Sequence, residues 1–141
     1  GVGSSAKGVS SVALGDGALA QTEQSVAIGK SATAKGGKAV SIGAGNVADG
    51  DGAVAIGDPN IVSGAGAVGM GKDNTVNGDG AVAIGNTNNA QGQGSIALGI
   101  RSSTTAAGSV ALGDSAAAQD LNSIAIGSTA KSNNASRMNA V

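Results

Sequence analysis

The pentapeptide Ser25-Val26-Ala27-Ile28-Gly29 recurs with small changes along almost the whole 141-residue chain. It joins a small residue, a β-branched residue, a second small residue, a larger aliphatic residue and a glycine. The closing glycines follow one another every 14 residues without insertion or deletion: Gly15, Gly29, Gly43, Gly57, Gly71, Gly85, Gly99, Gly113 and Gly127. An unbroken short period of this kind is typical of solenoids, in which each repeat stacks on its neighbours.

Each repeat contains two short strands separated by turns. In the pentapeptide, Val or Ile alternates with Ser, Ala or Gly, which is the period-two pattern of a strand with two different faces. After the glycine, small residues such as Ala32 and Ala34 alternate with polar ones, which predicts a second strand with one wet face. The closing glycines are expected at turns, through positive φ or close backbone approach. Each repeat therefore predicts one coil of a flat, two-sheet β-roll with parallel strands.

The composition limits the core that such a coil can build. The chain has no aromatic residue, no cysteine and no histidine, and it contains 26 glycines. Each coil offers about two large aliphatic side chains, which is little against the conformational entropy of its residues. Burial of more apolar surface between subunits would offset this entropy cost. The pentapeptide strand is suited to it, because it is apolar or small on both faces. We therefore expect about three identical rods around one axis.

Two orientations of the pentapeptide strand fit this alternation. In the one that we favour, Val and Ile fill the roll and the small residues lie at the subunit interface. In the reverse, the interior is lined by alanine, and Val and Ile lie at the axis. The aliphatic residues that form the roll core or the trimer interface are Val12, Leu14, Val26, Ile28, Val40, Ile42, Val54, Ile56, Val68, Met70, Val82, Ile84, Ile96, Leu98, Val110, Leu112, Ile124 and Ile126.

The pentapeptide, the 14-residue period and the Ala-x-Ala pattern after the glycine resemble the YadA-like head repeats of trimeric autotransporter adhesins. The resemblance covers residues 1–136, whereas residues 137–141 lose the glycine and are expected to begin a cap or neck. It implies an all-β fold, a left-handed parallel β-roll (solenoid) of 14-residue coils, assembled as an obligate homotrimer. It also implies that this segment is extracellular, on the outer membrane of a Gram-negative bacterium.

Two departures from the repeat pattern stand in the central part of the chain. Gly69 and Met70 replace the usual Ala and Ile, and we expect them to loosen that strand. Asparagine replaces the small residue three positions after the glycine in four repeats, which predicts a stacked amide ladder at Asn46, Asn60, Asn74 and Asn88.

Several functional classes are disfavoured by the residues present. Without His, Cys or Tyr, acid–base catalysis would depend on carboxylates or lysines, so we expect no enzyme, and no cofactor or metal. The turn acids Asp49 and Asp51 do not recur in register, unlike the acids of calcium-binding nine-residue repeats. A net charge of −1 without aromatic residues disfavours nucleic acid. No stretch predicts a signal peptide or membrane insertion, and the chain starts in register at Gly1, as a piece of a larger surface protein would.

The resemblance implies a surface adhesin that attaches bacteria to host cells or extracellular matrix, with threefold symmetry multiplying weak contacts. The sequence does not identify the host protein. Two alternatives stay open: a spacer that holds another adhesive domain away from the cell, and an ice-binding β-solenoid, which the scattered threonines disfavour. The residues that we expect to be exposed and available for ligand contact are Lys30, Lys35, Lys38, Lys72, Ile100 and Arg101.

Overall fold

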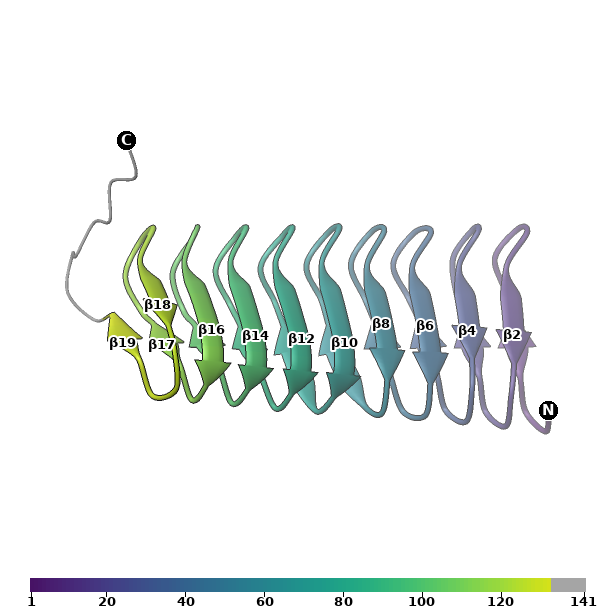
Figure 1. The fold of residues 1–141 in the computed structure, drawn as a ribbon. Helices are drawn as coiled ribbons and strands as arrows, with labels where there is room; N and C mark the ends of the chain where they lie inside the picture. The colour runs from purple at the N-terminus through teal and green to yellow at the C-terminus, as the bar shows by residue number, and fades with distance from the viewer. Residues whose placement is uncertain (133–141) are drawn as a thin grey trace.

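A computed structural model describes residues 1–132, which form a straight stack of similar coils (Figure 1). Each coil consists of two short strands joined by two turns. The β-roll of 14-residue coils expected from the sequence is confirmed over these residues. The boundary expected at residue 136 and the cap or neck expected over residues 137–141 lie outside the described residues.

Two parallel sheets run the length of the stack. The pentapeptide sheet contains β2 (Val12–Leu14), β4 (Val26–Ile28), β6 (Val40–Gly43), β8 (Val54–Gly57), β10 (Val68–Lys72), β12 (Val82–Asn86), β14 (Ile96–Ile100), β16 (Val110–Asp114) and β18 (Ile124–Ile126). The second sheet contains β1 (Ser5–Ala6), β3 (Leu19–Ala20), β5 (Thr33–Ala34), β7 (Val47–Ala48), β9 (Asn60–Val62), β11 (Asn74–Val76), β13 (Asn89–Ala90), β15 (Ser103–Thr104), β17 (Ala117–Ala118) and β19 (Lys131–Ser132).

Every strand pairs with its equivalent one repeat further along the chain. Val26 pairs with Val40, and Val40 pairs with Val54, so like residues lie above like residues. The backbone hydrogen bonds of both sheets therefore run along the stack and join coil to coil. No helix of residues 1–132 has the length and apolar character needed to cross a membrane.

The space between the two sheets is filled by small side chains. Ala27 of the pentapeptide sheet and Ala32 and Ala34 of the second sheet are fully buried in it. In the same coil, Val26 and Ile28 lie on the opposite face and are only partly covered. The orientation that we favoured from the sequence, with Val and Ile inside the roll, is therefore wrong, and the interior is lined by alanine, as in the reverse orientation.

The space between the sheets holds small side chains for a steric reason, which is seen in the coils where valine occurs there. Val62 and Val76 of the second sheet are fully buried, and both lie opposite Gly69. A Cβ added at Gly69 would lie 2.6 Å from Val62 Cγ2 and 3.4 Å from Val76 Cγ2. The sheets are thus so close here that a Cβ at residue 69 would overlap the side chain of Val62. The expected loosening at Gly69 and Met70 is wrong, because β10 pairs with both neighbouring strands in register.

The closing glycines turn the chain away from the pentapeptide sheet. Gly29 has a φ of +122°, in the region that favours glycine. A Cβ built on it would lie 2.1 Å from the carbonyl oxygen of Gly43 in the next coil. Positive φ and close backbone approach therefore both act at this position, and the coils stack closely because of it.

Candidate functional site

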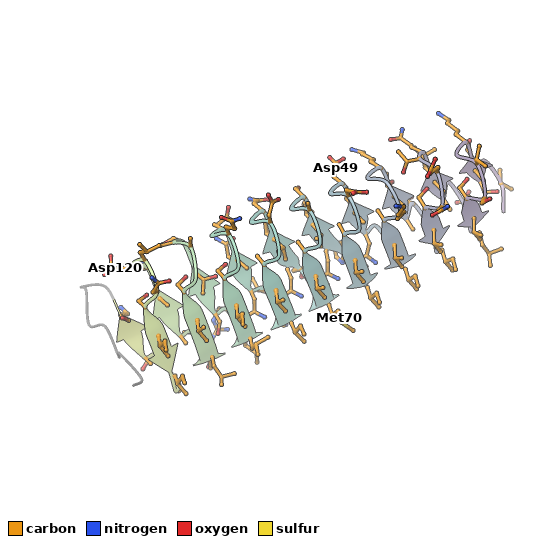
Figure 2. All side chains as sticks on the ribbon, turned by 90° about the horizontal axis from the view of Figure 1, so that it is seen from above. Asp49, Met70 and Asp120 are labelled. Carbon is orange, nitrogen blue, oxygen red and sulfur yellow. The ribbon has the colours of Figure 1, made fainter. Side chains whose placement is uncertain are left out.

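The outward face of the pentapeptide sheet carries two ranks of aliphatic side chains that run along the stack. One rank contains Val or Ile three positions before each closing glycine, and the other contains Leu, Ile or Met directly before it. Figure 2 shows Met70 of the second rank pointing away from the roll, on the side opposite Asp49. Because the register is one repeat at every step, the side chains of each rank stack in line.

This apolar face is exposed along the single chain. Ile84 is 42% exposed and Leu112 is 41% exposed, although both are large aliphatic residues. None of the nine pentapeptides contains a charged residue. Within residues 1–132, each strand of the sheet contacts only strands of its own and adjacent coils. A continuous exposed apolar surface is typical of interaction sites. We refer to it below as the apolar face.

The outward face of the second sheet has a different chemistry. Its rank four positions after each glycine is mixed: Leu19, Thr33, Val47, Ile61, Thr75, Asn89, Ser103, Ala117 and Lys131. Ile61 is 50% exposed and lies in a shallow pocket of about 180 Å³, together with Pro59, Asp73, Asn74 and Thr75. The rank is not the uniform row of threonines that an ice-binding face would need. We refer to it as the mixed face.

The six residues expected to contact a ligand are all exposed, but they do not form one cluster. Four of them lie one or two positions after a closing glycine, at one edge of the coil: Lys30 and Arg101 on the turn, and Lys72 and Ile100 at the ends of β10 and β14. The other two, Lys35 and Lys38, lie at the opposite edge of the coil, around the second turn. The structure therefore divides the expected contact surface between two edges of the stack.

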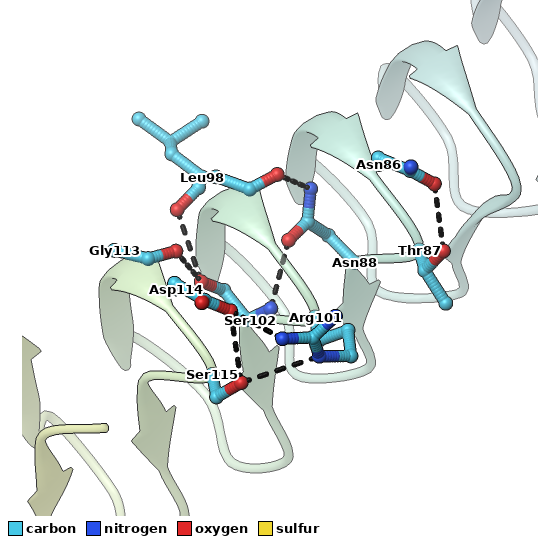
Figure 3. Close-up of polar contacts among 10 residues, drawn as sticks. Asn86, Thr87, Asn88, Leu98, Arg101, Ser102, Gly113, Asp114 and Ser115 are labelled. Carbon is cyan, nitrogen blue, oxygen red and sulfur yellow. Dashed lines mark hydrogen bonds and ion pairs between the residues drawn. The ribbon is translucent and has the colours of Figure 1, made fainter. Parts of the chain in front are cut away.

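Two of these basic side chains are already paired with acids on the same edge. The Arg101 guanidinium lies 2.8 Å from Asp114 Oδ1 and donates to Ser115 Oγ at 3.3 Å (Figure 3). The Lys72 ammonium lies 3.3 Å from the carboxylate of Asp73. Ile100, adjacent to Arg101, is 45% exposed and provides an apolar point on this charged edge.

Two features were not anticipated from the sequence. Gly69 accommodates Val62 and Val76, and the signal was the pair of valines placed one repeat apart around a glycine. The pocket at Pro59 and Ile61 gave no signal, because it depends on the shape of neighbouring turns. Across the described residues, no group of three or more His, Cys, Asp or Glu side chains could hold an ion.

Comparison with known proteins identifies the repeat. The YadA head domain repeat, in units of two copies, matches residues 6–32, 34–58, 63–88, 90–116 and 105–130. No curated protein matches the chain significantly. The matched segments cover most of the chain and follow the coils of the roll. The chain belongs to the YadA head domain family, a family of surface-exposed trimeric autotransporter adhesins and not of enzymes.

Proposed function

We propose that this chain is the head segment of a trimeric bacterial surface adhesin, with three parallel rods joined through their apolar faces. The observation that carries the proposal is the apolar face itself. Two uninterrupted aliphatic ranks run the length of the stack and carry no charge. In a single chain this surface meets water, whereas at a shared axis it would be buried.

The number of subunits and the hand of the coil follow from the family. YadA head domains belong to trimeric autotransporters, and three rods with parallel axes give each apolar face the same environment. Left-handed winding is likewise the family's property, and we propose it here. The mixed face and both turn edges then remain on the outside, extracellular on the outer membrane of the bacterium.

Attachment to host cells or extracellular matrix would use these outer surfaces. The edge with Lys72, Ile100 and Arg101 is our first candidate, since it combines charge with an exposed apolar side chain. Threefold symmetry repeats such a contact three times, so that a weak interaction becomes a strong one through avidity. Lys35 and Lys38 on the opposite edge form a second, separate candidate contact.

A spacer is the second candidate function. The expected contact residues are divided between two edges, and each is exposed and solvated. A uniform rod of stacked coils without a clustered site is suited to holding another domain at a distance. In this case the same apolar face would still join three chains.

Binding to a panel of matrix proteins and host cells separates the two functions. The adhesin proposal predicts saturable binding by the assembled chain, with weaker binding by a Lys72→Gln, Ile100→Ser, Arg101→Gln variant of unchanged mass in solution. A Lys7→Gln, Lys131→Gln variant, changed at two exposed lysines outside both candidate contacts, serves as the control for general loss of positive charge. An assembled chain that binds no member of the panel would support the spacer instead.

A further inference from the structure

The four buried asparagines form one continuous ladder through the middle of the roll. The Oδ1 atom of Asn46 accepts the backbone N–H of Asn60 at 2.7 Å and its Nδ2 at 3.0 Å. The same two contacts join Asn60 to Asn74 and Asn74 to Asn88. The ladder ends where Asn88 Oδ1 accepts the N–H of Ser102 at 2.8 Å (Figure 3).

Each amide nitrogen of the ladder also lies within hydrogen-bond distance of two backbone carbonyls, and its two N–H groups are shared among the acceptors around it. The Nδ2 of Asn60 lies 3.0 Å from the carbonyl oxygen of Ile56 in its own coil and 3.0 Å from that of Gly71 in the next. Three side-chain contacts therefore join Asn46 to the chain beyond its own coil, in addition to the sheets: two to Asn60 and one to the carbonyl oxygen of Gly57. The asparagine side chains are at most 1% exposed, so water cannot replace these bonds.

Coils with alanine at the same position have a weaker turn. The N–H of Ala32 reaches the carbonyl oxygen of Gly29 at 3.4 Å, and that of Ala130 reaches Gly127 at 3.3 Å. Both are long for hydrogen bonds between backbone groups. A methyl group offers no further donor or acceptor, so these turns are joined to the next coil through the backbone alone.

The pentapeptide strands change length along the stack. β10, β12, β14 and β16 each have five residues, whereas β2, β4 and β18 have three. Most of the extended strands lie in or beside the coils that contain the ladder. The ladder fixes the carbonyls at the end of each pentapeptide strand, including those of Met70 and Gly85, which favours continued pairing there.

We propose that the asparagine ladder makes the coils from Asn46 to Ser102 the stability centre of the rod, so that the end coils open first and the central coils last. Solenoid stability is a sum of repeat and nearest-neighbour terms, so a stronger junction protects the coils on both sides of it. A buried hydrogen-bonded group also resists opening, because breaking its bonds leaves polar atoms unpaired inside the roll. The inference does not depend on the proposed trimer. The apolar ranks continue through every coil, so assembly would stabilise the central and the end coils alike.

Site-resolved hydrogen exchange of the assembled chain tests this directly. We expect the backbone amides between Asn46 and Ser102 to exchange more slowly than those of the coils on either side. Asn74→Ala should accelerate exchange in β9, β11 and β13 by roughly tenfold or more, with the Asn88 amide affected most because it loses its acceptor.

Two further variants separate the ladder from simple packing. Asn74→Ser should have an intermediate effect, since Ser102 shows that a hydroxyl at this position still donates to the carbonyls of Leu98 and Gly113. Val76→Ala removes buried atoms from the same coil but leaves the ladder intact, so the Asn88 amide should keep its relative protection.

A variant that extends the ladder tests the same inference without destabilising the protein. Ala32→Asn would place an amide oxygen under the N–H of Asn46 and extend the ladder by one coil. We expect slower exchange of the Asn46 amide and of the coil around Ala32. Uniform protection along the wild-type rod, or an Ala32→Asn variant with unchanged exchange, would overturn the inference.

Discussion

The two sheets of the roll have the same alternation but opposite outward chemistry. Both direct small residues inward, as Ala55 and Ala48 show by their complete burial. Outward, the pentapeptide sheet presents continuous Val, Ile, Leu and Met, whereas the second sheet presents a mixture of polar and apolar residues. The coil is thus closed by methyl groups and backbone hydrogen bonds. Its large aliphatic side chains are available for contact between chains.

Ile56 and Ile61 allow this comparison to be tested within one coil. Ile56 lies on the apolar face, and Ile61 lies on the mixed face. Ile56→Lys should prevent or strongly weaken assembly, because an unpaired charge at a buried axis costs several kcal/mol per chain. Ile61→Lys should leave assembly intact. Mass in solution and the unfolding midpoint of both variants measure the difference, and equal effects on the two faces would break the comparison.

The steric contact between the inward faces of the two sheets can be tested at Gly69 and Val62. Gly69→Ala should destabilise the fold by about 1–3 kcal/mol, because the new Cβ overlaps the valine side chain. Val62→Ala in the same chain should recover much of this loss, since it restores the pair of small residues found in other coils. A double-mutant cycle by chemical denaturation gives the coupling. Additive effects of the two substitutions would show that the sheets are not in steric contact here.

The edge of the stack that follows the closing glycines should contribute least to the free energy of unfolding. Arg101 and Asp114 form an exposed ion pair, with both side chains at least half exposed, and such pairs stabilise proteins by about 1 kcal/mol or less. Arg101→Gln should therefore change the unfolding free energy only slightly and leave the mass in solution unchanged. An effect as large as that of Gly69→Ala would mean that the turn edges, and not the sheets, hold the stack together.

Much of the fold could be predicted from the sequence, because a period without insertions determines the register. The closing glycines predicted the length of the coil, and the two alternating patterns predicted two parallel sheets. The buried asparagines were also predictable as a ladder, since a polar residue at one offset in successive coils must lie beside its own kind.

The orientation of the pentapeptide strand could not be predicted in the same way. Alternation shows that a strand has two faces but does not show which one is inside. We assigned Ile28 and its equivalents to the interior, and the small residues of the same strand to the subunit interface. The distance between the sheets decides the question, and it depends on the turns and on pairs such as Gly69 and Val62. The contact residues were predicted as exposed, but their division between two edges required the coordinates.

The mass of the chain in solution, measured by light scattering, tests the central claim most directly. The apolar face predicts a stable assembly, and the family predicts three chains, about 39 kDa from three chains of 12.9 kDa. This assembly should dissociate when Ile56 is replaced by lysine. A monomer of 12.9 kDa that stays folded at micromolar concentration would contradict the account, because the aliphatic ranks would then be stable in water.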